Sequence, residues 1–395
     1  MNFAYYRQSL VLILLTFQLA LPILSTDIYL PSLTAIGHYF NTSITHVQLT
    51  LTTYFFTFGV VQLIYGSLSD RFGRKPMILL SLVIYIIASL GCAFSTSISM
   101  LTTQRFIQAC GTGSAILTFA IVRDLYQNER VAKAIAYMSA VVALSPILAP
   151  ILGGYIQKHL SWQWNFTLLA LLGMVILVLS CRFLPETNCH RNKLMPLKAL
   201  FLNYIHLLSD PRYMRHALSA AFAFAALFSY VSGAPYIFLN LMGYPSDVFG
   251  WLFATAAIGY VAGAFTNGYL VSKLGLAWMS SIGIASLMSG SVLMTIGIYL
   301  YPHHVILILL PQLVCEFGIS IVVSNMITKA LQPIPQHAGA GSALIGFFRF
   351  GLAALCSYLV VVFHSQSPFS LALIILSCSG CSCIFLITKS KCINF

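Results

Sequence analysis

The chain has 395 residues, of which 59% are hydrophobic and only 7% are charged, and its formal net charge is +12. A soluble protein of this length needs far more charge on its surface, so the composition excludes an ordinary soluble domain. The basic residues fall in loops between apolar runs, so the positive charge predicts membrane topology rather than a nucleic-acid partner.

Apolar runs of about 20 residues recur along the whole chain, which predicts an all-α membrane protein. The first run, 8–31, is too long for the apolar part of a signal peptide, and no cleavage site follows at the usual distance. We therefore expect it to be retained as a transmembrane helix. Reading the runs against charged or Pro/Gly/Asn breaks gives twelve spans, at 8–31, 46–68, 76–96, 100–123, 134–157, 163–184, 215–240, 247–270, 276–300, 304–328, 338–363 and 368–388.

The loops between these spans alternate in charge. Of the 20 basic residues, 17 lie on one side, which also holds both termini, and the other side has only Lys158. The remaining two, Arg105 and Arg349, lie within spans. Because cytoplasmic loops carry the excess of lysine and arginine, we expect both termini to be cytoplasmic in a bacterial inner membrane.

A polar segment at 185–214 separates two groups of six spans, so we expect an N-terminal half at 1–184, a cytoplasmic linker, and a C-terminal half at 215–395. Part of this linker, LMPLKALFLNYIHLL, predicts an amphipathic helix on the inner membrane surface. The halves show a weak repeat. A shift of 202 residues aligns Gly66 with Gly268, Arg71 with Lys273, and Gly73 with Gly275. Parallel six-helix halves are a transporter arrangement with the substrate site between them.

Charged residues inside spans are costly, so each predicts a function or a partner. Asp27 lies late in the first span, and Arg105 lies about five residues into the fourth, which runs the opposite way. We therefore expect both at similar depth in the outer half. Arg105, Gln108 and Thr112 share one helical stripe that we expect to face the central cavity. Asp27 is the expected proton carrier or substrate counter-charge, and a purely structural ion pair with Arg105 is the alternative.

The second half has its own pair of intramembrane charges. Glu316 and Arg349 are both expected near the midplane, in neighbouring spans, and Gln312, Glu316 and Ser320 share one stripe. A direct ion pair would be the least costly way to bury both charges, and substrate binding is the equally weighted alternative.

Aromatic residues make up 13% of the chain. Tyr29, Tyr54 and Phe58 are expected to line a cavity for flat apolar molecules, although aromatic residues in spans more often serve packing or interface anchoring.

Three segments are long and specific enough to compare with known motifs: GSLSDRFGRKP at 66–76, RFIQACGTG at 105–113 and SPILAPILGG at 145–154. STDIYLP, IVRDLY and LPET accompany them. Together these segments resemble the major facilitator superfamily, in particular the drug:proton antiporter branch of bicyclomycin and chloramphenicol resistance (Bcr/CflA type) exporters. The first resembles the family's loop 2–3 signature, the second its span-four arginine motif and the third its antiporter motif.

The resemblance implies roles for two groups of residues. A cytoplasmic gating motif would comprise Gly66, Asp70, Arg71, Gly73, Arg74 and Asp124. In it Asp70 would face the N-terminus of span eleven and Arg74 would pair with Asp124, unless the basic residues only set topology. A tight, proton-proof helix interface in span five would use Pro146, Pro150, Gly153 and Gly154, and ordinary helix packing is the alternative.

The sequence thus predicts a secondary transporter that exports small molecules in exchange for protons. It has no phosphate-binding GxxxxGK[ST] loop and no HExxH or GxSxG motif, so we expect neither an ATP-driven pump nor an enzyme with catalytic residues. The cysteines Cys378, Cys381 and Cys383 have apolar flanks, so we expect no metal and no cofactor beyond the coupling proton.

Two substrate classes remain open. One is a broad set of amphipathic drugs, and the other is a dedicated secreted metabolite such as a carboxylate siderophore, since arginine binds carboxylates well. We expect a monomer. An intramembrane enzyme and a non-transporting sensor are the less favoured alternatives.

Overall fold

A computed structural model describes residues 3–127, 129–188, 197–334, 337–363 and 368–387, and every regular element in these ranges is a helix. The chain divides into two compact units. Unit 1 comprises Met1–Met195 and Tyr244–Trp251, and unit 2 comprises Pro196–Gly243 and Leu252–Phe395. The predicted linker at 185–214 is therefore divided between the two units. Unit 1 also includes the first residues of a later helix, which begins at Ser246.

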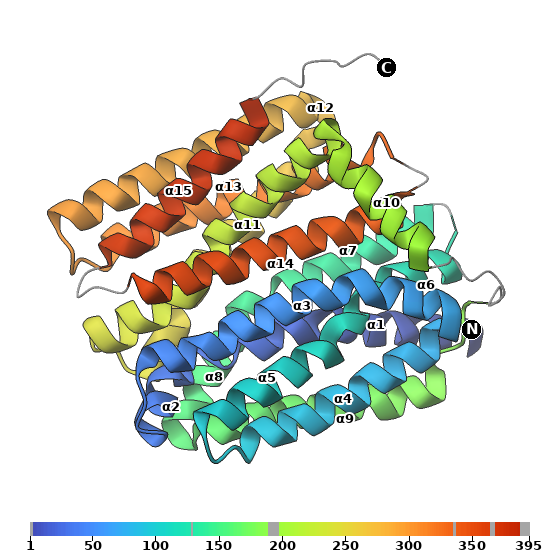
Figure 1. Cartoon of the computed structure of the whole chain (residues 1–395), viewed down its shortest axis with the longest axis horizontal. Coiled ribbons are helices and arrows are strands. Elements are labelled where there is room, and N and C mark those ends of the chain that lie inside the picture. Colours follow the sequence, from blue (N-terminus) through green and yellow to red (C-terminus); the bar gives the residue numbers. More distant parts are fainter. Residues whose placement is uncertain (1–2, 128, 189–196, 335–336, 364–367, 388–395) are drawn as a thin grey trace. The chain divides into compact units, whose positions relative to one another are not determined.

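Unit 1 contains six membrane spans (Figure 1). Its helices are α1 (Phe3–Asp27), η1 (Leu30–Ser32), α2 (Leu33–Tyr39), α3 (Ile44–Phe72), α4 (Arg74–Ala93), α5 (Ile98–Thr112), η2 (Gly113–Ile116), α6 (Leu117–Leu125), α7 (Glu129–Ala143), α8 (Ser145–His159) and α9 (Trp162–Phe183). Helix α4 packs between α5 and α9, α3 packs on α5, and α1 packs on α7, α8 and α9.

Three of these spans are interrupted near their middle. The first consists of α1, η1 and α2, the fourth of α5, η2 and α6, and the fifth of α7 and α8. The first interruption follows Asp27, where Pro31 opens a short 3-10 turn because proline suits the start of a helix. The span then continues to Tyr39, beyond the predicted end at residue 31, so Asp27 lies closer to mid-span than the sequence indicated.

Unit 2 is built around α11 (Pro211–Pro235), which packs on α13 (Ile306–Leu331), α14 (Ala338–Val362) and α15 (Phe369–Ile387). A one-turn helix, η3 (Tyr236–Leu241), continues α11. The predicted amphipathic helix is present as α10 (Leu197–Ser209), which packs on α11 and α14 and exposes Leu202, Ile205 and Leu208.

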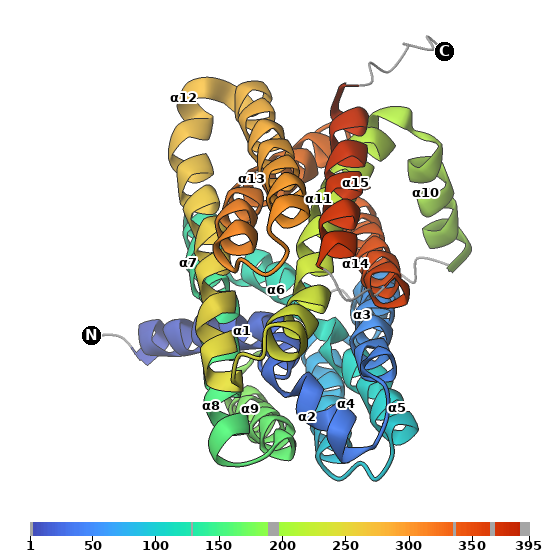
Figure 2. The same cartoon turned by 90° about the vertical axis from the view of Figure 1, so that its left-hand side faces the viewer.

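The continuous helix α12 (Ser246–Leu300) accounts for two predicted spans, because its backbone turns at Gly275 (Figure 2). The described residues contain eleven apolar helical segments that are long enough to cross a membrane. One of these segments is the 55-residue α12, which corresponds to two predicted spans, so the eleven segments account for all twelve. Gly275 has φ 81° and ψ 160°, and its predicted repeat partner Gly73 has φ 101° and ψ 155°. The aligned glycines therefore adopt the same left-handed conformation, which disfavours any residue with a Cβ.

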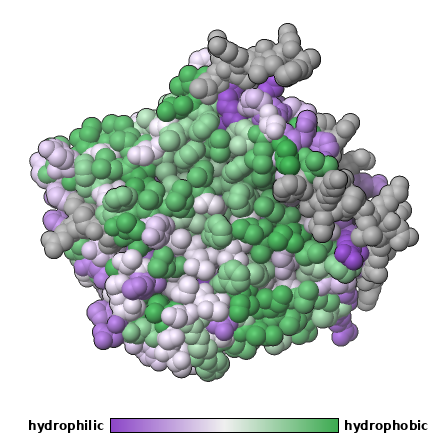
Figure 3. All heavy atoms as spheres, viewed as in Figure 1, coloured by the Kyte–Doolittle hydropathy of each residue, from purple (hydrophilic) through white to green (hydrophobic). Residues whose placement is uncertain are grey.

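Hydrophobic residues cover much of the face of the molecule shown in Figure 3. Ile87 is 64% exposed, Leu171 61% and Val178 58%, and all three lie in membrane spans. Such surfaces are rare on soluble proteins and are the normal lipid-facing surface of transmembrane helices.

Candidate functional site

The largest fully buried side chain in unit 1 is a cation. Arg105 of α5 is 0% exposed, and its guanidinium carbon lies 4.3 Å from the ring centre of Tyr54, 5.0 Å from Tyr29 and 5.8 Å from Phe166. We call these three rings the aromatic cage. Aromatic faces stabilise a desolvated cation by about 2 kcal/mol or more, which offsets part of the cost of burying Arg105.

Hydrogen bonds hold the guanidinium edge. Arg105 Nη1 donates to the carbonyl of Ser25 at 2.9 Å and to Gln108 Oε1 at 2.6 Å. The Gln108 Nε2 in turn donates to Ser89 Oγ at 2.8 Å. Arg105 Nε and Nη2 are buried without a hydrogen-bond partner. One edge of the guanidinium thus keeps free donors inside a low-dielectric interior.

The aromatic and polar neighbours of Arg105 are themselves fixed by hydrogen bonds. Tyr54 Oη donates to Thr112 Oγ1 at 3.2 Å, and Tyr54 stacks on Phe58. Tyr29 Oη lies 2.8 Å from Thr50 Oγ1, whose own proton goes to the carbonyl of Val47, so Tyr29 is the donor. The sequence-predicted residues Tyr29, Tyr54, Phe58, Gln108 and Thr112 are therefore brought together around Arg105, all buried.

Asp27, at the end of α1, is 5% exposed. Its Oδ1 lies 3.0 Å from the hydroxyl of Thr26. The same hydroxyl lies 2.8 Å from the carbonyl of Ile23, and it has only one proton to donate. When that proton goes to Ile23, the Thr26 oxygen can accept a hydrogen bond from a protonated Asp27.

The expected direct Asp27–Arg105 ion pair is not formed. The three ion pairs among the described residues lie elsewhere, and Arg105 instead bonds the backbone two residues before Asp27. The physical reason lies in the end of α1. Because the helix ends at Asp27, the carbonyl of Ser25 is available to Arg105, and the aromatic cage holds the guanidinium beside it. The Asp27 carboxyl group and the guanidinium of Arg105 both lie at the C-terminal end of α1, but in this structure they have different partners.

Four residues of this site were missed by the sequence analysis: Ser25, Tyr85, Ser89 and Phe166. Ser25 donates to the carbonyl of Leu21, so Tyr85 must donate to Ser25 across their 2.8 Å contact. The polar residue Ser89 and the aromatic residue Phe166 lie in apolar runs where their types are common. Only the three-dimensional packing of α4 and α9 against α5 and α1 identifies them.

The glycines of α8 allow two close backbone contacts. A Cβ on Gly153 would overlap the carbonyl oxygen of Ile28, the residue after Asp27, and a Cβ on Gly154 would overlap the carbonyl oxygen of Ser246. A Cβ on Gly250 would lie 2.6 Å from the carbonyl oxygen of Pro150. Small residues at these positions therefore let α8 touch both the end of α1 and the start of α12.

An ion pair lies beside the contact between α8 and α12. Lys158 Nζ lies 2.7 Å from Asp247 Oδ2, so the lone basic residue predicted on its side of the membrane has a partner in the first turn of α12. Half of the Lys158 side chain is exposed, so solvent screens this pair strongly.

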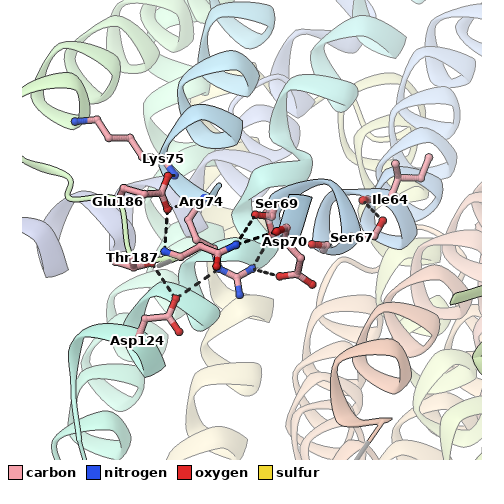
Figure 4. A network of polar contacts seen from close by, with 11 residues as sticks. Ile64, Ser67, Ser69, Asp70, Arg74, Lys75, Asp124, Glu186 and Thr187 are labelled. Atoms are coloured by element: carbon pink, nitrogen blue, oxygen red, sulfur yellow. Dashed lines mark hydrogen bonds and ion pairs between the residues drawn. The ribbon is translucent and has the colours of Figure 1, made fainter. Parts of the chain in front are cut away.

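A polar network forms where α3 meets α4, built around Arg74 (Figure 4). Arg74 Nη1 lies 3.2 Å from Asp70 Oδ1 and 2.7 Å from Ser69 Oγ, and Arg74 Nε lies 3.5 Å from Asp124 Oδ2. The predicted Arg74–Asp124 contact is therefore confirmed. The expected contact of Asp70 with span eleven stays a prediction, as does a role for Arg71, which stacks on its neighbour Phe72.

Glu186, from the LPET segment after α9, completes this network (Figure 4). Its Oε1 accepts the backbone N–H of Arg74 at 3.0 Å, and its Oε2 accepts that of Lys75 at 3.3 Å. Thr187 Oγ1 donates to Asp124 at 2.9 Å. A carboxylate is favoured at a helix N-terminus, where backbone N–H groups lack intrahelical partners. A Cβ on Gly73 would overlap Glu186, a second reason for glycine there. A Cβ added to Gly66 would meet nothing within 4 Å, so packing does not require glycine at that position.

Unit 2 has a second polar cluster, formed by Gln312 and Glu316 of α13, Tyr230 and Phe224 of α11, Tyr260 of α12 and Arg349 of α14. Gln312 Nε2 donates to Glu316 Oε1 at 2.9 Å. The guanidinium of Arg349 lies 3.9 Å from the ring centre of Phe224. Tyr260 interacts electrostatically with both Glu316 and Arg349. Gln312 and Glu316 are on one face, as the predicted stripe requires.

The expected Glu316–Arg349 ion pair is also absent from the ion pairs of the described residues. Arg349 instead stacks on the neighbouring α11, which places an aromatic ring opposite it. In the cysteine run of α15, Cys378 Sγ lies 3.5 Å from Cys356 Sγ of α14. Within the described ranges, no group of three or more metal-ligand side chains is found.

The polar cluster of unit 2 makes a thermodynamic prediction. Glu316→Gln and Arg349→Gln should each lower the thermal stability of the detergent-solubilised protein. The loss in the double mutant should differ from the sum of the two single losses by about 0.5 kcal/mol or more, because both residues act on Tyr260. Thermal melts of the four proteins measure this, and a double mutant that shows the simple sum would contradict the coupling.

The comparisons with known proteins agree with this architecture. The family model of the Major Facilitator Superfamily matches residues 15–357. A bicyclomycin resistance protein homolog of Haemophilus influenzae is 30% identical over 348 residues, 86% of each chain. A chloramphenicol resistance protein of Pseudomonas aeruginosa is 30% identical over 352 residues, 87% of this chain and 81% of the relative.

Among solved structures, the xylose transporter XylE of E. coli superposes with a TM-score of 0.75 over 98% of this chain and 99% of its own, at 15% identity. The peptide transporter POT in complex with sulfate superposes with a TM-score of 0.77 over 95% of this chain and 93% of its own, at 14% identity. At these identities the likeness establishes the fold alone.

Proposed function

Because this chain belongs to the Major Facilitator Superfamily, and is thus a multi-pass membrane transporter and not an enzyme, we propose that it exports small molecules across the bacterial cytoplasmic membrane in exchange for protons. The two units would alternate between inward and outward access, as parallel six-helix halves do in such transporters. The distribution of basic residues supports cytoplasmic termini. A monomer suffices, because each chain carries both halves.

The observation that carries the proposal is Asp27. It is a 5% exposed carboxyl group in the middle of a membrane span, with a hydroxyl and no cation as its described partner. An ionised carboxylate is costly to bury without a cation, so a protonated Asp27 is the less costly occupant of this structure. A group that must change its charge when its surroundings open to water is suited to carry a proton.

Arg105 supplies the other half of the switch. Its Nε and Nη2 are free donors, and it is anchored to the carbonyl of Ser25, two residues before Asp27. A modest change at the broken end of α1 would bring the ionised carboxylate to this free guanidinium edge, which binds carboxylates in a planar, bidentate way. Deprotonation would then be coupled to a change in backbone position.

The contact between α8 and α1 connects this proton site to the rest of the fold. Because Gly153 lies against Ile28, a displacement of the end of α1 must be accommodated by α8. The same helix touches residues 246–250 of α12 through Gly154 and Pro150. The antiporter-like motif therefore has a physical route for transmitting the protonation state of Asp27.

For substrates, we propose a set of amphipathic drug-like molecules, since the two relatives described above are named for bicyclomycin and chloramphenicol resistance. Tyr29, Tyr54 and Phe58, which are buried around Arg105 in this structure, would offer flat apolar surfaces to such molecules once exposed. A dedicated metabolite exporter is the second candidate, because neither Arg105 nor Arg349 is neutralised by a carboxylate among the described residues. A carboxylate siderophore would be one such metabolite, although none of the relatives described above supports it.

Everted membrane vesicles test the function. A pH gradient, acidic inside, is established and followed with a pH-sensitive dye, and bicyclomycin or chloramphenicol is then added. The proposal expects proton release from the vesicles that depends on this protein and on the drug. Drug accumulation that is unaffected by an uncoupler would contradict proton exchange.

The network around Arg74 predicts a kinetic effect. Asp70→Asn removes one of the two carboxylates that hold Arg74, and should slow transport severalfold without changing the order of substrate preference. Asp210→Asn is the matched control, because an asparagine caps α11 as well as an aspartate. Initial rates for several drugs decide it, and an altered preference at normal turnover would contradict the assignment.

A further inference from the structure

We propose that Tyr85 of α4 is a positioning residue for the proton site: through Ser25 it fixes the carbonyl on which Arg105 is anchored, and so keeps Arg105 apart from Asp27. The inference rests on the proposed function and concerns how that same site is controlled. The Tyr85 hydroxyl bonds Ser25 and not Asp27, so it would act on the proton only through its neighbours.

Tyr85 closes a ring of hydrogen bonds that joins three helices. Arg105 of α5 donates to the carbonyl of Ser25 in α1. It also donates to Gln108, whose amide donates to Ser89 of α4. Tyr85, one turn before Ser89, donates to the hydroxyl of Ser25 at 2.8 Å and completes the ring. We call these five residues the three-helix ring. All of them are buried, so their hydrogen bonds lie in a low-dielectric interior.

The carbonyl of Ser25 is available because the first span is interrupted. In a continuous α-helix this carbonyl would accept the backbone N–H of Tyr29, four residues further on. Here that N–H instead donates to the carbonyl of Thr26 at 3.3 Å, and Arg105 donates to Ser25 in its place. The position of Arg105 therefore depends on the last turn of α1, and the Tyr85 hydroxyl holds that turn.

Close packing fixes the Tyr85 side chain. A Cβ on Gly111 of α5 would lie 2.5 Å from the backbone nitrogen of Tyr85, and a Cβ on Gly173 of α9 would lie 2.9 Å from its ring. Two neighbouring helices thus pack directly against Tyr85 and restrict movement of its ring. A hydroxyl held in this way can fix the position of the group that it bonds.

The same face of α4 makes a second contact of this kind one turn earlier. Ser81, Tyr85 and Ser89 follow one another at intervals of four residues and so share one face of the helix. Ser81 contacts Ser114 of η2, which also accepts a hydrogen bond from Gln18 of α1 at 2.6 Å. Helix α4 therefore joins α1 to the fourth span at two levels.

Asp27 interacts with a neighbour of the same ring. Tyr54 of the aromatic cage interacts electrostatically with both Asp27 and Arg105. Arg105 has two buried donors, Nε and Nη2, without a hydrogen-bond partner, and an ionised Asp27 would attract them. The three-helix ring resists that movement. Loss of the hydrogen bond between Tyr85 and Ser25 would free the last turn of α1, let Arg105 pair with the ionised carboxylate, and slow the return of a proton to Asp27.

Tyr85→Phe tests the inference in reconstituted liposomes, because it removes the hydroxyl and leaves the ring in its packing site. Two rates of chloramphenicol movement are measured: net transport driven by a pH gradient, and exchange of labelled for unlabelled drug at equal concentrations without a gradient. Only net transport requires Asp27 to take up a proton in each cycle. We expect net transport to fall about tenfold, the effect of one buried hydrogen bond, while exchange stays within about twofold of the wild type.

Tyr65→Phe is the matched control. The Tyr65 hydroxyl also donates between helices of unit 1, to the carbonyl of Cys110 at 2.7 Å, but it is not part of the three-helix ring. This variant should keep both rates within about twofold of the wild type. If Tyr85→Phe behaves like Tyr65→Phe, or if it lowers net transport and exchange in parallel, Tyr85 has only a structural role and the inference fails.

Ser25→Ala removes the same hydrogen bond from its other side. It should show the same split between net transport and exchange, also where Tyr85→Phe fails to fold, and thermal melts show which variants are folded. Because both substitutions break one bond, the double mutant should lose no more net transport than Tyr85→Phe alone. Losses that multiply in the double mutant would overturn the inference.

The outcomes separate the inference from the proposed function. A wild-type protein that exchanges chloramphenicol but shows no gradient-driven transport would reject proton exchange, and the inference with it. Gradient-driven transport in the wild type, without the expected split in Tyr85→Phe, would retain the exporter and reject the role of Tyr85.

Discussion

Replacing Asp27 by asparagine should reduce transport driven by a pH gradient by about a hundredfold or more, the range expected when a group that transfers the proton is lost. The protein should still fold, because an asparagine side chain has the same size and can still accept a hydrogen bond from Thr26, whose hydroxyl lies 3.0 Å from the carboxyl group of Asp27. Substrate binding should remain within a few-fold of the wild-type affinity.

Drug-dependent proton release from everted vesicles measures the loss of coupling. Drug binding to the purified variant shows, independently of coupling, that the variant is folded and that its substrate site is intact. Asp210→Asn is the matched control because Asp210 lies at the N-terminus of α11, outside the spans. Retained coupling in the Asp27 variant would remove this carboxyl group from the mechanism.

Gly153→Ala should be the most damaging single-methyl substitution in the first unit. Its Cβ would overlap the carbonyl oxygen of Ile28, and backbone cannot rotate away as a long side chain can. Helix α8 and the end of α1 must then separate, at a cost of about 1–3 kcal/mol, which is typical of overpacking. We expect a lower melting temperature and at least about a tenfold loss of transport, which corresponds to about 1.4 kcal/mol.

The matched control is Gly380→Ala in α15, where an added Cβ would meet nothing within 4 Å. That substitution should be neutral or slightly stabilising, because alanine favours a helix more than glycine does. Normal transport and stability for Gly153→Ala would show that the close contact between α8 and α1 is unnecessary, and would disconnect the antiporter-like motif from Asp27.

Much of the fold follows from periodicity and charge alone. The spans could be predicted because lipid demands long apolar helices, and each loop between spans carries polar or Gly/Pro residues. The weak repeat that aligned Gly73 with Gly275 also holds in structure, since both glycines have the same left-handed backbone. The interruptions were harder to predict. The first span continues past Pro31 because a proline can start a helix as well as end one.

The sequence identified the charged residues of the candidate sites, but not the contacts that these residues make. A buried charge is conspicuous in an apolar sequence, so Asp27, Arg105, Glu316 and Arg349 were identifiable. Their partners were not, because pairing opposite charges ignores two alternatives available to arginine. Arg105 uses a backbone carbonyl and the aromatic cage, and Arg349 uses the ring of Phe224. The LPET segment was singled out, but the contact of its Glu186 with the start of α4 was not predicted, because a helix cap supplied from more than a hundred residues away leaves no local sequence pattern.

Drug accumulation in reconstituted liposomes tests directly whether a proton gradient drives export. The membrane potential is held at zero, a pH gradient is imposed, and the internal and external concentrations of an uncharged drug such as chloramphenicol are measured at steady state. For one proton exchanged per molecule, each pH unit should support about a tenfold concentration ratio, because both correspond to about 1.4 kcal/mol. If a proton gradient drives export, the ratio rises with the pH gradient and falls to one in the Asp27→Asn variant. A ratio of one at every pH gradient in the wild-type protein would contradict proton-driven export.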